Sequence, residues 1–337
     1  MTNRVSVAVV GATGVVGEPL LTALEARAFP IETLYCLDEG DAVGEKLRLL
    51  GKSITVEDIA DFDFTKVDLV FFCGEVDVSV RHVPMAIDSD CKVIDCSGAF
   101  SSAFDVPLVI PAINPHLLEE DGGSRLIANP SAVTVALLTV LKPLHESVGI
   151  ERANITVLEP VSVAGKPGID ELAAQTVALL NMKETRSRVF PQQIAFNLLP
   201  QDGQILENGY TLGEMNLVAE AQKILGEERG FVVNPTTVLV PVFYGQGIAV
   251  NLACRSHLSA MEVRGLLTDI PNVTLQEESA PTPVTDATKA EKVFVGRVRE
   301  DIANPHGLNL WITADNVRTC AALNAVQIAE LWEKCYT

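Results

Sequence analysis

The chain has 337 residues, of which 48% are hydrophobic and 20% charged, and its formal net charge is −19. This length predicts two domains, because single hydrophobic cores stop growing near roughly 250 to 300 residues. The negative charge, without any Lys/Arg cluster interleaved with aromatic residues, excludes nucleic acid as a partner. No run approaches the roughly 18 apolar residues of a membrane span, so we expect a cytoplasmic protein.

Seven cysteines and five histidines are present, and none of them has the spacing of a metal site. An odd number of cysteines in a chain without a secretory signal predicts free thiols. Cys91 and Cys96, in "CKVIDCSG", fit a buried strand better than a ligand pair, and there is no H-E-x-x-H. We therefore expect no bound metal.

The first part of the chain alternates short apolar runs with polar or helical stretches, which predicts a parallel doubly wound sheet over residues 1 to about 130. The first run, residues 5–10, leads into a glycine turn and then a helical pattern through Leu20, Leu21 and Leu24. The later runs are "IETLYCL", "VDLVFFCG", "KVIDCSG", "PLVIP" and "RLIANP".

Longer strands follow from "ANITVLEPVS" onward, with helices at "IDELAAQTVALLN" and "EMNLVAEAQKIL" between them. This pattern predicts a mixed α+β second domain. We place a Rossmann-like dinucleotide-binding domain at residues 1–131, completed by a C-terminal helix at 318–337. The second domain is placed at residues 132–317.

The glycine turn "GATGVVG" places Gly11, Gly14 and Gly17 between a strand and a helix, which is a variant of the dinucleotide fingerprint. Such a turn brings backbone N–H groups and a helix N-terminus to a pyrophosphate, so Thr13 and Val16 are also candidate cofactor-binding residues. A tight turn without a ligand is the alternative. A Walker A site is excluded because no Gly-Lys-Ser/Thr follows.

Two acidic residues, Asp38 and Glu39, end the second predicted strand, where an acid would hydrogen-bond the ribose hydroxyls of NAD. The 2′-phosphate of NADP would meet like charge there. The alternative is a solvated acidic loop.

The chain resembles the aspartate-semialdehyde dehydrogenase family, and most closely its usg-type homologues. The resemblance spans nearly the whole chain and is carried by these segments: "VAVVGATGVVG", "VIDCSGAF", "VPLVIPAIN", "IANPSAVT", "SVAGKPGIDEL", "GYTLGEMNLVAEAQKIL", "LVPVFYGQGIAV" and "ADNVRTCAALNAVQIAE". It implies a dimerisation and substrate domain after the Rossmann-like domain, a homodimer and a role in amino-acid biosynthesis. It also implies further cofactor-side residues, namely Cys73, Ser97, Pro130, Gly165 and Asn316.

The family reaction uses a cysteine thiolate that attacks the semialdehyde, a histidine that handles protons, a hydride transfer to NADP, and phosphate that cleaves the thioester. The resemblance places Ala132 at the position of the cysteine and Gln246 at that of the histidine. Leu239, Ser101 and Asn216 occupy the positions of cationic substrate anchors. Neutral groups at these positions supply neither the charge nor the bidentate geometry that an anionic substrate requires.

From these replacements we expect a homologue without the classical dehydrogenase activity that retains dinucleotide binding and dimerisation. Weak candidates for a substitute group are Cys96, otherwise a buried strand-end cysteine, and Glu159, otherwise a hydrogen-bonded polar group. The alternatives are an active aspartate-semialdehyde dehydrogenase, a different NAD enzyme on this scaffold, and an interaction subunit in a mixed dimer with the authentic enzyme. NAD or NADP is the expected cofactor, and the acidic pair disfavours NADP.

Overall fold

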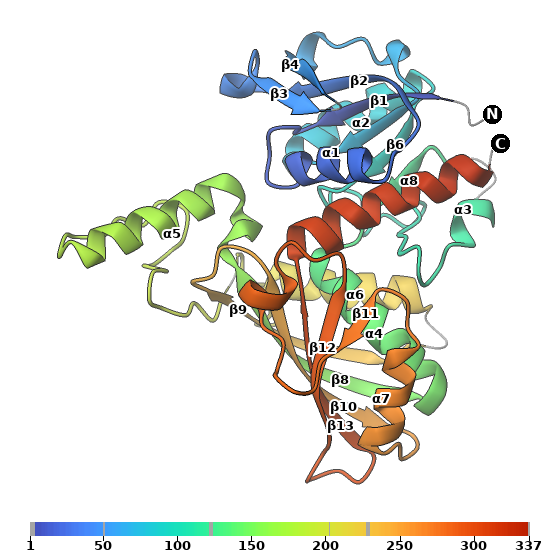
Figure 1. The fold of residues 1–337 in the computed structure, drawn as a ribbon, viewed down its shortest axis with the longest axis vertical. Coiled ribbons are helices and arrows are strands. Elements are labelled where there is room, and N and C mark those ends of the chain that lie inside the picture. Colours follow the sequence, from blue (N-terminus) through green and yellow to red (C-terminus); the bar gives the residue numbers. More distant parts are fainter. Residues whose placement is uncertain (1–3, 50, 121–123, 202, 227–229, 336–337) are drawn as a thin grey trace. The chain divides into compact units, whose positions relative to one another are not determined.

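The computed structural model describes residues 4–49, 51–120, 124–201, 203–226 and 230–335. The chain divides into two compact units, one formed by Met1–Ser131 with Ala321–Thr337 and the other by Ala132–Cys320. Each unit has its own sheet (Figure 1). The predicted two-domain α/β fold, with a Rossmann-like parallel sheet first, is confirmed.

The first unit contains a seven-stranded sheet in the order β3-β4-β2-β1-β5-β6-β7. Its strands are parallel except for the antiparallel pair β3 and β4. The strands are β1 Val5–Val10, β2 Ile31–Asp38, β3 Lys46–Leu49, β4 Lys52–Asp58, β5 Leu69–Phe72, β6 Lys92–Asp95 and β7 Leu126–Ala128. The predicted strand "PLVIP" contributes only an isolated bridge, from Leu108 to Ala128. The β3–β4 hairpin was not predicted.

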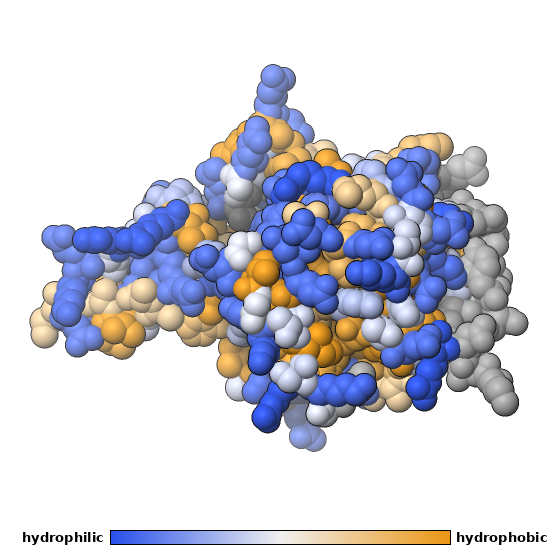
Figure 2. Space-filling model, turned by 90° about the horizontal axis from the view of Figure 1, so that it is seen from above, coloured by the Kyte–Doolittle hydropathy of each residue, from blue (hydrophilic) through white to orange (hydrophobic). Residues whose placement is uncertain are grey.

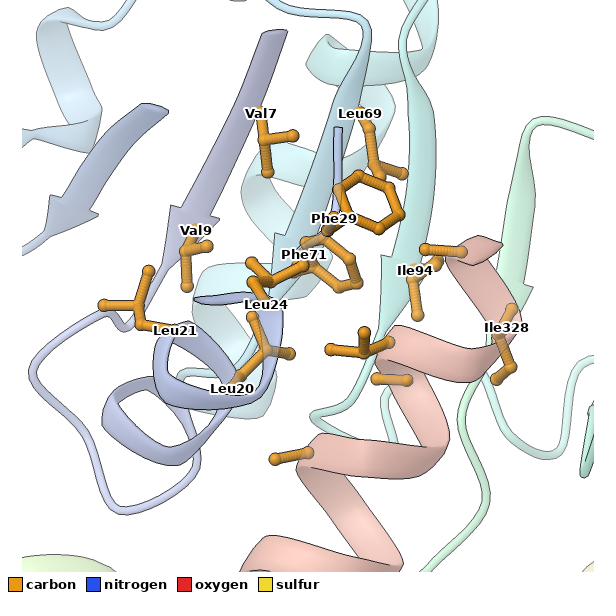
Figure 3. Packing of buried hydrophobic residues seen from close by; sticks show 14 of the residues in the cluster. Val7, Val9, Leu20, Leu21, Leu24, Phe29, Leu69, Phe71, Ile94 and Ile328 are labelled. Carbon is orange, nitrogen blue, oxygen red and sulfur yellow. The ribbon is translucent and has the colours of Figure 1, made fainter. Parts of the chain in front are cut away.

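Helices cover this sheet and complete its core: α1 Gly17–Ala26, α2 Val76–Asp88, α3 Leu117–Glu120 and α8 Asn324–Cys335. Leu20 and Leu24 of α1 lie in one buried cluster with Phe71 of β5, Ile94 of β6 and Ile328 of α8 (Figure 3). Burial of such side chains stabilises the fold by about 1.5–3 kcal/mol each. The end of the chain is therefore an integral part of the dinucleotide-binding unit.

The second unit contains a six-stranded sheet in the order β11-β12-β13-β10-β8-β9. Its strands are β8 Ile150–Pro160, β9 Val232–Val240, β10 Gln246–Cys254, β11 Val273–Leu275, β12 Val293–Glu300 and β13 Gly307–Ala314. Its helices are α4 Ala132–Val148, α5 Gly165–Leu180, α6 Leu212–Leu225 and α7 Ala260–Thr268. A π-helical segment, Asn316–Leu323, follows β13 and leads into α8. The mostly buried α4 contacts strands β8, β10, β12 and β13.

The α5 helix and the segment after it extend away from the sheet of the second unit (Figure 1). Glu171 of α5 anchors the return segment, since it accepts hydrogen bonds from the backbone N–H groups of Arg188 and Val189 at 2.7 Å each. Hydrophobic side chains remain exposed here, including Leu180 at 72% and Met182 at 98%. Figure 2 shows orange and tan surface on its left side, where the α5 segment lies in Figure 1. No helix in the described ranges is long and apolar enough to span a membrane.

Candidate active site

In the glycine turn of the first unit, the backbone packs directly against the backbone of neighbouring segments. Gly11 has a φ of 73°, and a Cβ on it would lie 2.6 Å from the nitrogen of Gly74. A Cβ on Gly17 would lie 2.1 Å from the carbonyl oxygen of Gly11. Only glycine fits at either position, so the start of α1 lies directly against the turn. A helix N-terminus placed in this way is a natural site for a phosphate.

Asp38, at the end of β2, is bonded to the glycine turn itself. Its Oδ2 accepts from the Oγ1 of Thr13 at 2.7 Å and from the backbone N–H of Thr13 at 3.2 Å. Its Oδ1 accepts from the backbone N–H of Glu39 at 3.0 Å. Asp38 therefore fixes the shape of the turn, a role that the sequence did not predict.

Glu39 lies between two side chains of α2. Its Oε2 is 3.1 Å from the Nη2 of Arg81, and its Oε1 is 3.8 Å from the Nε2 of His82. Arg81 also contacts Asp77 at 3.3 Å. Arg81 was missed by the sequence analysis because it reaches this edge from a helix beyond β5. Arg81 is thus a cation beside the acidic edge of the sheet that is already paired with carboxylates.

Two thiols lie at the carboxyl ends of β5 and β6. The neighbouring Cys73 thiol and burial raise the pKa of Cys96 well above its usual range. Ser97 donates through Oγ to the Oδ1 of Asp95 at 2.6 Å. Burial raises the pKa of this Asp95 carboxyl. The Nδ2 of Asn129, just before Pro130, donates to the carbonyl of Ala321 at 3.1 Å.

In the second unit, Ala132 and Gln246 are direct partners. Ala132 begins α4, and its carbonyl accepts a 2.8 Å hydrogen bond from the Nε2 of Gln246, which is 1% exposed. The same Nε2 lies 3.9 Å from the sulfur of Cys320. Burial raises the pKa of the Cys320 thiol above its ordinary value. The sequence analysis missed Cys320, because only the fold brings it beside β10.

Asn316 connects three segments of the second unit. Its Oδ1 accepts from the backbone N–H of Gly245 at 3.0 Å, and its Nδ2 donates to the Oγ of Ser162 at 3.0 Å. Gly165, with a φ of 68°, begins α5 just after that serine. Glu159 lies half-buried near the end of β8, beside Leu239 of β9.

The predicted site residues thus form separate groups within their own units. In the first unit the structure brings together Gly11, Gly14 and Gly17, and Thr13 with Asp38. Val16 directly precedes α1. The backbone of Cys73 packs against Gly11, so Cys73 lies beside the glycine turn. Cys96 in turn lies next to Cys73. Among the described side chains, no group of three or more His, Cys, Asp and Glu could hold a metal.

The glycine turn, the parallel sheet and the second α+β unit define a dinucleotide-binding protein of the two-domain dehydrogenase type. The model described as "Semialdehyde dehydrogenase, NAD binding domain" matches residues 6–121, and "Semialdehyde dehydrogenase, dimerisation domain" matches residues 141–319. The chain belongs to the aspartate-semialdehyde dehydrogenase family.

Similar proteins match along essentially the full length. Aspartate-semialdehyde dehydrogenase 2 of Vibrio cholerae is 43% identical over 337 residues, covering 100% of both chains. Aspartate-semialdehyde dehydrogenase of Legionella pneumophila is 44% identical, covering 99% of this chain and 97% of the relative. The crystal structure of the Vibrio cholerae aspartate semialdehyde dehydrogenase II complexed with ASA has a TM-score of 0.96 at 43% identity, covering 99% of this chain and 100% of that one.

These matches correct one prediction. We expected a homologue without classical dehydrogenase activity, on the basis of Ala132 and Gln246. The curated relatives that match the whole chain at 42–44% identity are named aspartate-semialdehyde dehydrogenases, which supports an active enzyme instead. The error came from giving two side chains more weight than the similarity of the other residues.

Proposed function

We propose that this chain is an NAD(P)-dependent aspartate-semialdehyde dehydrogenase, an oxidoreductase that acts on an aldehyde. The observation that carries the proposal is its full-length similarity to relatives with that name. The glycine turn and the N-terminus of α1 would hold the pyrophosphate, and the Asp38–Glu39 edge would face the ribose. A bound nicotinamide would supply the hydride acceptor.

We further propose that NAD is preferred over NADP. Asp38 and Glu39 place two carboxylates at the end of β2, and Arg81 is already paired with Glu39 at 3.1 Å. A 2′-phosphate would bring additional negative charge to this edge and would compete with Glu39 for the guanidinium. The ribose hydroxyls of NAD, in contrast, donate hydrogen bonds to carboxylates.

We assign the reactive thiol to Cys96. Position 132 has only a methyl group and Gln246 cannot exchange a proton at neutral pH, and on this basis we propose that the chain is of the usg type. Cys320, beside Gln246, is 0% exposed, whereas Cys96 is half-buried at the carboxyl edge of the nucleotide-binding sheet. Ligands of such sheets bind at this edge.

The chemistry requires the Cys96 sulfur to lose its proton and bond to the aldehyde carbon. Loss of hydride from that carbon leaves a thioester, which phosphate cleaves to an acyl phosphate while the thiol is released. Asn129 lowers the pKa of the Cys96 thiol, opposing the larger effects of Cys73 and burial, which raise it. Asn129 would thus stabilise the thiolate that begins the reaction.

The test measures NAD and NADP reduction with aspartate semialdehyde and phosphate, using protein made in a strain that lacks its own aspartate-semialdehyde dehydrogenase. We expect turnover, and we expect Cys96→Ser to lower kcat by at least about 10³-fold, because loss of a nucleophile costs up to about 10⁶ in a well-studied protease. Cys320→Ser is the matched control and should stay within about tenfold of the parent. Folded protein without turnover would overturn the proposal, whereas turnover that survives Cys96→Ser would overturn only the assignment of the thiol.

We also infer that the protein is a homodimer. The match to a dimerisation domain over residues 141–319 supports this, as do the exposed apolar side chains of the α5 segment, Val177, Leu180 and Met182. Exposed apolar groups that cluster on one surface mark sites of protein association. Light scattering of the purified protein should give twice the chain mass of 36.2 kDa. A mixed dimer with another dehydrogenase chain would instead appear as a second polypeptide of different mass.

A further inference from the structure

Cys73 and Cys96 occupy equivalent positions on neighbouring parallel strands. Phe72 at the end of β5 pairs in register with Asp95 at the end of β6, and each cysteine is the next residue along its strand. The backbone N–H of Cys96 donates to the carbonyl of Phe72 at 2.8 Å, so the strands remain together at this point. Neighbouring strands lie about 4.8 Å apart, within the Cα separation of roughly 4.4–6.8 Å that a disulfide spans.

Residues paired in register on neighbouring parallel strands point to the same face of the sheet, so the two side chains lie next to each other. Both residues are half-buried, whereas the side chains of Cys36, Cys91, Cys254 and Cys320 are buried. A small oxidant can therefore reach this pair in preference to the others.

We propose that Cys73 and Cys96 form a reversible disulfide on exposure to a peroxide, and that this disulfide weakens dinucleotide binding at the adjacent glycine turn. The thiolate of Cys73 attacks the peroxide, an S–O bond forms, the O–O bond breaks, and the leaving hydroxide is protonated to water. The sulfur of Cys96 then attacks that of Cys73, and the S–O bond breaks. The released hydroxide takes the Cys96 proton, so two thiols lose two electrons and hydrogen peroxide becomes two waters.

The coupling to the turn follows from packing, and it rests on the proposed function because it requires a dinucleotide site. A Cβ on Gly11 would lie 2.9 Å from the carbonyl carbon of Cys73 and 2.7 Å from the Cα of Gly74. The backbones therefore touch, and no side chain is available to absorb a shift. Forming an S–S bond of about 2.05 Å draws the sulfurs inside their non-bonded distance. The bond fixes the side-chain torsions of Cys73, and any accompanying shift of its backbone is passed directly to Gly11.

The experiment treats the full-length reduced protein with hydrogen peroxide and then maps its peptides by mass spectrometry without reduction. We expect a loss of two hydrogens and a cross-link between the peptides that contain Cys73 and Cys96. The dissociation constant for NAD, measured by calorimetry, should rise by about tenfold or more and return after dithiothreitol treatment. Cys73→Ser and Cys96→Ser should each abolish the cross-link. The control Cys254→Ser, at a buried cysteine of the second unit, should retain it.

Each remaining outcome decides one part of the proposal. Addition of oxygen to single thiols without a cross-link would overturn the disulfide, and a cross-link that leaves NAD affinity unchanged would overturn the coupling. Reduced protein that binds no dinucleotide would overturn the proposed function and the coupling together. In that case the mass spectrum of the peptides alone would decide whether the disulfide forms. Thermal unfolding of each serine variant confirms that a missing cross-link does not reflect misfolding.

Discussion

The two units present their candidate site groups in different ways. In the first unit the geometry depends on backbone positions where a side chain has no room, such as Gly11 and Gly17. In the second unit the geometry depends on a side chain, the Gln246 amide, which donates to the carbonyl of Ala132. A backbone constraint admits no substitute, whereas a hydrogen bond can be made by another donor. The fold can therefore keep positions 132 and 246 packed together while the reactivity of the side chains at these positions changes.

The largest expected effect is at the glycine turn. Gly11→Ala adds a Cβ that would lie 2.6 Å from a backbone nitrogen at a φ of 73°. Overpacking costs about 1–3 kcal/mol and the strained backbone a similar amount. We expect several kcal/mol of lost stability in urea unfolding and no measurable NAD binding. The control Gly40→Ala, with a φ of 64° and nothing within 4 Å, should lose only about 1–2 kcal/mol.

If both substitutions proved equally mild, the first unit would be as tolerant as the second and the contrast between them would fail. Calorimetric titration with NAD separates the two effects, because the Gly40 variant should bind like the parent protein.

The next effect concerns the second unit. The double substitution Ala132→Cys and Gln246→His would place a thiol at the start of the 17-residue helix α4 with an imidazole beside it. A helix N-terminus favours the thiolate, and a positioned base contributes about 10²–10⁴ in rate. We expect kcat for aspartate semialdehyde to rise by about 10².

The matched control for that pair is Ala132→Ser with Gln246→His, which keeps the imidazole but supplies a poorer nucleophile. Equal rates for the cysteine and serine versions would show that position 132 does not reach the reacting carbon.

The pattern of the sequence was sufficient for much of the fold. The runs "VAVV" at residues 7–10 and "LVFF" at residues 69–72 are uninterrupted because these parts of β1 and β5 are buried on both faces of the sheet. The β3–β4 hairpin was missed because its strands are mostly exposed, so charged residues such as Lys46, Arg48 and Lys52 obscured the strand pattern. An edge ribbon of this kind carries little hydrophobic signal.

The site was less predictable than the fold because its contacts depend on register and packing. Motif spacing found the glycine turn and Asp38, yet the bond from Thr13 to Asp38 requires β1 and β2 to be aligned. The same holds for Cys73 beside Cys96, which are far apart in sequence and meet only through the pairing of β5 with β6. Residue types alone also led to the wrong prediction of inactivity.

A smaller effect should appear in the choice of cofactor. Glu39→Gln removes one of the carboxylates paired with Arg81 and leaves the guanidinium more available to a 2′-phosphate. We expect the ratio of NADP to NAD affinity to rise by about tenfold, equivalent to about 1.4 kcal/mol. The control Asp77→Asn removes the other carboxylate paired with Arg81. Because the Asp77 side chain is 76% exposed, this substitution should change the ratio of NADP to NAD affinity less. Equal changes would mean that only the total charge matters.

The smallest expected effect is a pH dependence confined to the first unit. Burial lowers the pKa of His82, and the charge of Arg81 adds to this, while Glu39 and Asp58 oppose it. Because the folded protein takes up this proton less readily than the unfolded chain, stability is fully present above pH ~6.5 and declines as pH falls below that value. His82→Gln should flatten urea-unfolding stability between about pH 7 and 5. An unchanged slope in His82→Gln would show that another group carries the pH dependence.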